Sequence, residues 1–199
     1  MLEANTVLIK ENALPIEYQN TIEAFVKDTH FPWFLQDNIS GVDGAFNDPR
    51  FVPSTGFTHM LFKDDEIKSN FFLHDINFEN IIIKLAKSFN VNLEDILRAK
   101  LNLTTPIFNY TSENFCAPHR DLFIPHWVFL YYINDSDGDT VLFETNTDPY
   151  DPNLKIAHRV TPKKGKCILF DGTIYHTQSN PIQTPNRINL NVDVKLCTH

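Results

Sequence analysis

The feature that most constrains the fold is an eight-residue run, 187–194, in which polar and apolar side chains alternate strictly. The polar members are Arg187, Asn189, Asn191 and Asp193, and the apolar members are Ile188, Leu190, Val192 and Val194. A period of two places these sets on opposite faces of a β-strand. Arg187 would offer a planar fork for a carboxylate if the polar face lines a barrel. When Arg187 is considered alone, a strand face exposed to solvent is a better explanation than a carboxylate site inside a barrel.

Six other short runs rich in β-branched and aromatic residues accompany this one in the second half of the chain. They are residues 100–104, 127–133, 140–144, 157–160, 167–170 and 174–178. Turn residues separate them, which is typical of a β-sandwich or jelly roll. Seventeen Phe supply rigid apolar volume for its core.

The first half has a mixed pattern. A strand is expected at 6–9, a helix at 16–28 after a proline that favours a first turn, and a second helix after the N-cap residue Asn77. A short third helix is expected at 93–98. The predicted fold class is mainly β with flanking helices, a double-stranded β-helix (jelly roll).

The length of 199 residues predicts a single domain over 1–199. Residues 1–99 would form a mixed helical and strand support with a lid, and residues 100–199 the jelly-roll core. Segment 37–56 is rich in Gly, Pro, Asp and Asn, so it is expected to be a long loop. It is either a lid over a site or a solvated connection.

The composition limits the partners. A formal net charge of −8 argues against nucleic acid, which requires clustered Lys and Arg. No apolar run approaches the length of a membrane span, and no signal peptide is visible. Three cysteines without C-x-x-C spacing suggest reduced thiols. A cytoplasmic protein is therefore expected.

Two histidines and one aspartate are candidate metal ligands. In extended chain, His119 and Asp121 face the same side, and one imidazole plus one carboxylate are two thirds of a 2-His-1-carboxylate facial triad. The pair alone also fits a surface turn. His176 follows a strand, an Asp-Gly turn and the start of a second strand, so another part of a sandwich could deliver it as the third ligand. A buried structural histidine is the alternative.

Over residues 100–195 the chain resembles the iron(II)/2-oxoglutarate-dependent dioxygenases, in particular their prolyl-hydroxylase-like branch. The matching pieces occur in the family's order: Asn109-Tyr110, His119-x-Asp121, residues 130–134, residues 137–143, residues 162–166 with 169–170, His176 and Arg187. The small size and Asn-rich composition are similar to short dioxygenases of marine bacteria and phages. Many relatives have Gly-Gly-x-Thr where this chain has Asp137-Gly138-Asp139-Thr140.

The resemblance implies two sets of site residues. It implies iron(II) ligands at His119, Asp121 and His176, and 2-oxoglutarate contacts at Arg187, for the distal carboxylate, and at Tyr110, Tyr132 and Thr140. The two tyrosines fit equally as aromatic residues of the sandwich core.

The implied reaction is hydroxylation of a C–H bond with release of succinate and carbon dioxide, with ascorbate as a reductant. The substrate would be a protein, for instance at a prolyl residue, or a small molecule, and the oligomeric state is left open. Two rivals are a cupin-like metal enzyme that lacks 2-oxoglutarate and a non-catalytic jelly-roll binding module. Iron-dependent conversion of 2-oxoglutarate to succinate would favour the oxygenase over both.

Overall fold

The computed structural model describes residues 2–40, 46–74, 76–145 and 147–197. The larger sheet contains β1 (Val7–Lys10), β2 (Phe34–Gln36), β3 (Gly56–Lys63), β4 (Glu66–Ile67), β5 (Leu93–Thr104), β6 (Trp127–Tyr132), β9 (Cys167–Asp171) and β11 (Arg187–Leu196). The smaller sheet contains β7 (Thr140–Phe143), β8 (Ile156–Val160) and β10 (His176–Gln178). The helices are α1 (Ile16–Val26), the 3-10 turn η1 (Asn70–Phe72) and α2 (Phe78–Ser88).

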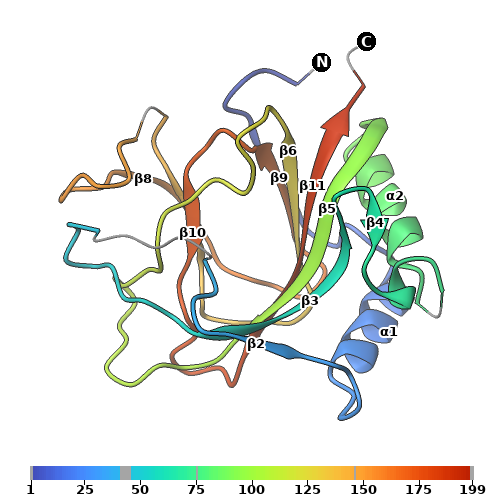
Figure 1. Ribbon diagram of the computed structural model, residues 1–199, viewed down its shortest axis with the longest axis horizontal. Coiled ribbons are helices and arrows are strands. Elements are labelled where there is room, and N and C mark those ends of the chain that lie inside the picture. Colours follow the sequence, from blue (N-terminus) through green and yellow to red (C-terminus); the bar gives the residue numbers. More distant parts are fainter. Residues whose placement is uncertain (1, 41–45, 75, 146, 198–199) are drawn as a thin grey trace.

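The two sheets form a jelly roll. The larger sheet has the order β1-β9-β6-β11-β5-β3-β2, with β4 paired to β3, and the smaller has the order β10-β7-β8. Both helices lie on the outer side of the larger sheet, away from β8 and β10 (Figure 1). The predicted fold class, mainly β with flanking helices, is therefore confirmed.

Strand β11 is buried on both faces. Its apolar side chains, Ile188, Leu190, Val192 and Val194, join one core cluster with apolar residues of both helices. The polar side chains are also inaccessible, and Arg187 is only 2% exposed. The predicted alternation is confirmed, and a solvated strand face is excluded because the polar face is turned into the jelly roll.

The two predicted helices form for local reasons. The side chain of Asn77 accepts a hydrogen bond from the backbone N–H of Asn80, which caps α2. The apolar stripe of α2, including Ile81, Ile82 and Leu85, is fully buried. Helix α1 follows Pro15 as expected and ends two residues earlier than predicted.

The third predicted helix, at 93–98, is wrong. These residues begin β5, a 12-residue strand paired with β11 on one side and β3 on the other. Two long neighbouring strands outweigh local helix propensity here. The boundary expected at residue 100 consequently falls inside β5, and β1, β2 and β3 from the first half join the same sheet.

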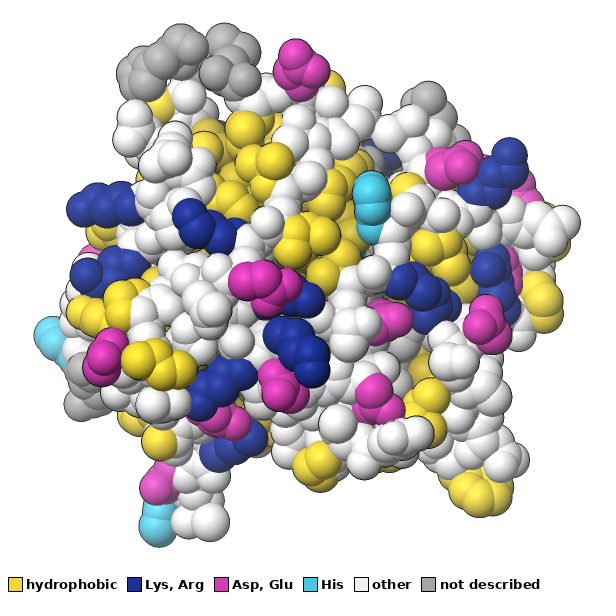
Figure 2. All heavy atoms as spheres, turned by 180° about the vertical axis from the view of Figure 1, so that it is seen from behind, with side chains coloured by type: hydrophobic (Ala, Val, Ile, Leu, Met, Phe, Trp, Pro, Cys, Tyr) yellow, Lys and Arg dark blue, Asp and Glu magenta, His cyan; other side chains and the backbone are white. Residues whose placement is uncertain are grey.

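Charged residues of both signs are mixed on one face of the molecule. On the face turned away from the viewer of Figure 1, Lys and Arg side chains lie among Asp and Glu side chains, and apolar side chains gather in its upper part (Figure 2). Neither described helix has the length and apolar character needed to cross a bilayer.

The turn before β7 is tied to the turn before β11 by Asp137. Its carboxylate accepts hydrogen bonds from the backbone N–H groups of Ile182, Gln183 and Thr184, the shortest 2.8 Å long. Burial raises the pKa of Asp137, but these bonds and the Thr184 hydroxyl outweigh it and lower the pKa to about 2. Asp137 therefore has a structural role in the segment where the chain departs from the usual Gly-Gly-x-Thr.

We predict that Asp137→Asn lowers the free energy of unfolding at pH 7 by about 1–2 kcal/mol. Because the folded-state pKa lies below the ordinary value of about 3.9, this stabilisation is present above that pH. It is lost as the pH falls through about 2. Urea unfolding of both proteins between pH 7 and pH 2 measures the difference, and a difference that stays constant over this range contradicts the assignment.

Candidate functional site

The backbone holds His119 and His176 side by side. The N–H of each residue donates to the carbonyl oxygen of the other, at 2.9 Å and 3.0 Å, in an isolated antiparallel bridge. His176 begins β10, where it pairs with Leu142 of β7. Two segments far apart in the sequence thus present two imidazoles with ring centroids 4.8 Å apart.

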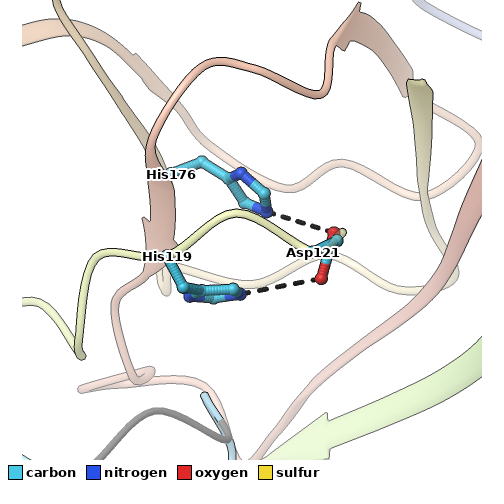
Figure 3. A group of neighbouring side chains, drawn as sticks. All are labelled: His119, Asp121 and His176. Carbon is cyan, nitrogen blue, oxygen red and sulfur yellow. Dashed lines mark ion pairs between the residues drawn. The ribbon is translucent and has the colours of Figure 1, made fainter. Parts of the chain in front are cut away.

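Asp121 completes this group. Its Oδ1 lies 3.8 Å from His119 Nε2, and its Oδ2 lies 3.3 Å from His176 Nε2 (Figure 3). One ligand atom from each of the three residues can be chosen so that all lie within 4.8 Å of one another. The structure therefore brings together the three residues that the sequence singled out as metal ligands.

Both imidazoles are oriented by backbone carbonyls. His119 Nδ1 lies 3.0 Å from the carbonyl oxygen of Ala117, and His176 Nδ1 lies 3.2 Å from that of Ile174. A ring that donates through Nδ1 leaves the Nε2 lone pair free for a metal. Burial, followed by the neighbouring His176, lowers the pKa of His119 to about 4. His119 is therefore neutral at pH 7, in the form that binds metals.

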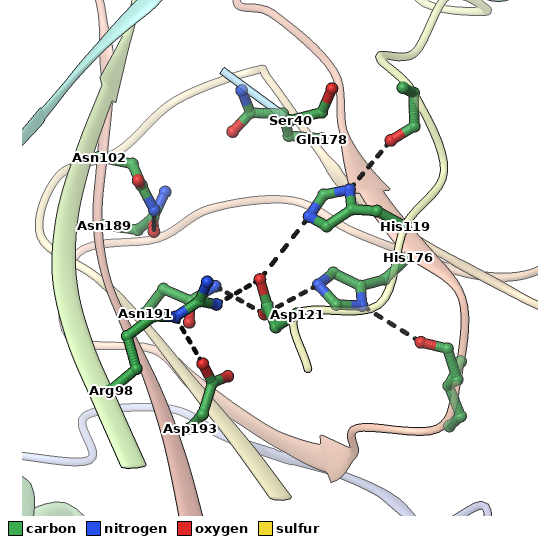
Figure 4. A network of polar contacts seen from close by, with 12 residues as sticks. Ser40, Arg98, Asn102, His119, Asp121, His176, Gln178, Asn189, Asn191 and Asp193 are labelled. Carbon is green, nitrogen blue, oxygen red and sulfur yellow. Dashed lines mark hydrogen bonds and ion pairs between the residues drawn. The ribbon is translucent and has the colours of Figure 1, made fainter. Parts of the chain in front are cut away.

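Asp121 is held by polar residues from the two central strands. Arg98 Nη2 lies 2.5 Å from Asp121 Oδ1, and Arg98 Nε lies 2.6 Å from Asp193 Oδ2. Asn191 donates to Asp121 Oδ2 at 3.1 Å (Figure 4). Burial alone would raise the pKa of Asp121, but the Arg98 cation holds it well below its usual range. Burial and then the charge of Asp121 raise the pKa of Asp193.

Arg187 lies at the opposite end of β11 from Asp193. It donates from Nε to Gly138 O at 2.8 Å, from Nη1 to Gln178 Oε1 at 3.0 Å and from Nη2 to Thr140 Oγ1 at 2.8 Å. A guanidinium has five N–H donors, so two have no partner among the residues that the structure describes and could bind a ligand. The Tyr132 hydroxyl also donates to Thr140 Oγ1, at 2.7 Å. Tyr132 and Thr140 thus orient Arg187.

One pocket connects the histidines with Arg187. Its empty space, including the part open to solvent, is about 410 Å³, and His119, His176, Thr140 and Arg187 are all in its lining. Thr140 lines the pocket beside Arg187, and its contact with a co-substrate stays a prediction. Tyr110 and Tyr132 are buried but are not among the lining residues, so their direct contact with a co-substrate stays a prediction.

Segment 37–56, predicted as a lid or a connection, reaches this pocket. Ser40 is in the lining, and residues 41–45 lie outside the described part of the chain. Farther along, Arg50 Nη2 donates to the carbonyl oxygen of Leu154 at 2.6 Å, which ties the segment to the β7–β8 connection. Movement of the segment as a lid stays a prediction.

Sequence reasoning missed the contribution of β5 to the pocket. Lys100 and Asn102 line it, and Arg98 reaches Asp121 from the same strand. Residues 100–104 were expected to form a strand, and the alternation of Lys100 and Asn102 with Leu101 and Leu103 was a usable signal for a polar face. The helix predicted over 93–98 concealed Arg98 alone.

A further histidine, His126, follows Asp121 by five residues in the sequence. It is buried, at 4% exposure, and its Nε2 lies 3.9 Å from Asp193 Oδ1. A Cβ added to Gly172 would lie 2.2 Å from His126 Nε2, so only glycine fits beside this ring. The side chain of His126 is therefore packed against Gly172 and lies beside Asp193.

We predict that Arg98→Leu lowers the free energy of unfolding by about 3–5 kcal/mol, because two buried carboxylates lose their shared cation. The double variant Arg98→Leu/Asp193→Leu should recover most of this loss, since apolar residues can replace a buried ion pair. Urea unfolding with a chelator present measures both free energies of unfolding.

The control is Lys27→Leu, which breaks the exposed ion pair with Glu23. It should lower the free energy of unfolding by less than about 1 kcal/mol. A double variant less stable than Arg98→Leu would contradict the prediction.

No protein-family model matches this sequence, and no curated protein matches it. Among solved structures, the fold is similar to a prolyl-4-hydroxylase from Pseudomonas putida, with a TM-score of 0.55, 14% identity and coverage of 98% of this chain and 94% of that chain.

Two further solved structures are similar. A prolyl hydroxylase from Trichoplax adhaerens, in complex with a peptide fragment of hypoxia inducible factor, has a TM-score of 0.60 at 10% identity, covering 96% of this chain and 83% of that chain. HygX from Streptomyces hygroscopicus, with nickel and 2-oxoglutarate bound, has a TM-score of 0.61 at 11% identity with the same coverage. At these identities the similarity is one of fold, and this chain has the jelly-roll fold of the 2-oxoglutarate/iron(II) oxygenases.

Proposed function

We propose that this protein is an iron(II)- and 2-oxoglutarate-dependent oxygenase. The observation that carries the proposal is the grouping of His119, Asp121 and His176, together with a pocket whose lining contains both histidines and Arg187. Two imidazoles and a carboxylate on one face form the donor set of non-haem iron(II) oxygenases, which keep coordination positions open. Such a set fits the metal, and a buried guanidinium with two free donors fits a dicarboxylic co-substrate.

The protein's own residues orient and stabilise the groups that react. Bound iron with 2-oxoglutarate and dioxygen would supply the oxidation of a substrate C–H bond, with succinate and carbon dioxide released. The His119–His176 backbone bridge fixes the distance between the two rings. Arg98 and Asn191 keep the Asp121 carboxylate directed at the same point. These contacts restrain all three side chains, which reduces the reorganisation that metal binding would need.

Arg187 would bind the distal carboxylate of 2-oxoglutarate. Its side chain is held by Thr140, Gln178 and the carbonyl oxygen of Gly138, and it is almost fully buried. In a site shielded from water, a guanidinium–carboxylate pair is stronger than on the surface. Burial also disfavours an isolated cation and lowers the pKa of Arg187, and a bound carboxylate would offset this cost.

The substrate is a peptide or a small molecule. One of the similar structures contains a peptide fragment, and another structure of HygX contains hygromycin B. The same fold therefore accommodates both classes, and the choice between them rests on the residues that line this particular pocket.

We predict that His119→Ala and His176→Ala each abolish stoichiometric binding of iron(II) or Mn(II) and the formation of succinate from 2-oxoglutarate, because two remaining ligands do not hold the metal. Circular dichroism should show both variants folded. His158→Ala, which removes an exposed histidine of β8, is the matched control and should retain both properties. Calorimetry and a succinate assay with ascorbate present measure the two effects.

The same assays separate the rival functions. If the wild-type protein binds the metal but does not convert 2-oxoglutarate, a metal enzyme that lacks this co-substrate is favoured. If it binds neither, a non-catalytic jelly-roll module is favoured. Near wild-type turnover in His176→Ala would show that the ligand assignment is wrong.

We predict that Arg187→Ala weakens binding of 2-oxoglutarate by about 2–5 kcal/mol, because it removes one partner of a desolvated charge pair. Metal binding should change little, since Arg187 does not contact the three ligands. Arg187→Lys keeps the charge but not the planar fork and should give an intermediate affinity. Titration of 2-oxoglutarate into the Mn(II)-loaded proteins measures the effect, and equal affinity in wild type and Arg187→Ala would place the carboxylate site elsewhere.

A further inference from the structure

The pocket contains a second positively charged residue besides Arg187, which is Lys100 of β5. Both residues are in the lining of the pocket. They belong to different levels of the sheet, because Arg187 lies opposite Thr104 whereas Lys100 lies opposite Asn191. Lys100 and Thr104 are four positions apart on β5, which is roughly 13 Å of strand. The two cations therefore enter the same pocket from well-separated positions.

Lys100 comes from the level of the sheet that lies beside the metal ligands. The residue opposite it, Asn191, donates a hydrogen bond to Asp121 Oδ2 at 3.1 Å (Figure 4). Arg98, two positions before Lys100 and on the same face of β5, contacts Asp121 Oδ1. Burial first and the second imidazole next lower the pKa of His119, and the positive charge of Lys100 contributes to the same effect. The ammonium group is therefore close enough to the metal ligands to influence a charge bound there.

The ammonium group of Lys100 has no close partner among the residues that the structure describes. The side chain is half-buried, yet it makes no hydrogen bond or ion pair within that part of the chain. The nearest carboxylates are already paired with Arg98, which lies 2.5 Å from Asp121 Oδ1 and 2.6 Å from Asp193 Oδ2. A cation withdrawn from water is best satisfied by an anionic group. We therefore expect an anionic ligand to supply that group.

Metal binding would give this end of the pocket an excess of positive charge. Four ionisable side chains interact here, and the carboxylates of Asp121 and Asp193 at most balance the charges of Arg98 and Lys100. A divalent metal would add two positive charges, which Lys100 repels. A carboxylate located between the metal and Lys100 would attract both. Because Arg187 would bind the distal carboxylate of 2-oxoglutarate, the carboxylate next to the keto group is the one available.

We propose that Lys100 binds the carboxylate next to the keto group of 2-oxoglutarate and thereby couples co-substrate binding to metal binding. This inference rests on the proposed function and deepens it by assigning a second cation to the co-substrate site. Lys100 by itself disfavours the metal, whereas the bound carboxylate attracts both Lys100 and the metal. Each ligand then strengthens the binding of the other, because such a coupling is reciprocal. A neutral residue at position 100 would make this coupling weaker.

The first experiment measures the coupling. Mn(II) is titrated by calorimetry into wild type, Lys100→Met and Lys195→Met, each with and without saturating 2-oxoglutarate. The factor by which 2-oxoglutarate strengthens Mn(II) binding should be at least about threefold smaller in Lys100→Met than in wild type. Without 2-oxoglutarate, Lys100→Met should bind Mn(II) at least as tightly as wild type, because a repelling charge is gone. Lys195, an exposed lysine of β11, controls for the loss of one positive charge, and its variant should match wild type.

The outcomes separate this proposal from the proposed function. Failure of wild type to bind 2-oxoglutarate would refute the proposed function. If wild type binds it, a coupling factor in Lys100→Met that lies within about threefold of the wild-type factor would overturn the role of Lys100 alone. Weaker binding of Mn(II) by Lys100→Met without 2-oxoglutarate would overturn it too. Lys100→Gln is a second neutral variant, which gives the same test if Lys100→Met does not fold.

The second experiment identifies the carboxylate that Lys100 contacts. The analogue 2-oxopentanoate has a methyl group in place of the distal carboxylate of 2-oxoglutarate and keeps the other end of the molecule. In the Mn(II)-loaded protein, Lys100→Met should weaken the binding of both compounds by at least about threefold, whereas Arg187→Ala should weaken the binding of 2-oxoglutarate alone. If Lys100→Met weakens the binding of 2-oxopentanoate by less than about threefold, Lys100 does not bind this carboxylate and the proposal is wrong.

Discussion

The pairing of β5 with β11 is the constraint on which the site depends. These strands lie in the middle of the larger sheet, and β11 is buried on both faces over almost its entire length. One face packs against the helices, and the other faces the pocket. Because a buried polar group must have a partner, the polar face has to be satisfied by neighbouring side chains or by a ligand. That requirement accounts for the charge cluster that Arg98 forms with Asp121 and Asp193.

The charge cluster of Arg98, Asp121 and Asp193 orients the Asp121 carboxylate more than it stabilises the fold. Arg98 pairs with two carboxylates that are almost inaccessible to solvent. The free-energy cost of removing such charged groups from water can exceed the gain from their mutual attraction. The result is an Asp121 side chain whose two oxygens are held in place, by Arg98 on one side and by Asn191 on the other. A metal ligand restrained in this way loses little conformational freedom when a metal binds.

The accuracy of prediction from sequence differed between the site and the fold around it. The sequence singled out His119, Asp121, His176 and Arg187 because each lies in a short run whose period or turn chemistry is visible locally, and because their order resembles that of a known family. The structure places these four residues close together. The start of β5 was mistaken for a helix, since its pairing with β11 and β3 depends on residues far away in the chain. The error hid Arg98 as the partner of Asp121.

The sequence by itself determined the strand period of 187–194, the caps and apolar faces of the helices, and the residue types that can bind a metal. Local chemistry is sufficient for these, because each depends on neighbours within a few positions. Only the tertiary structure decided that His119 and His176 share a backbone bridge and that Lys100 faces the same pocket as Arg187. Such contacts join segments separated by tens of residues, and their geometry depends on which strands pair and in which register, so it involves the partner strand as well as the local pattern.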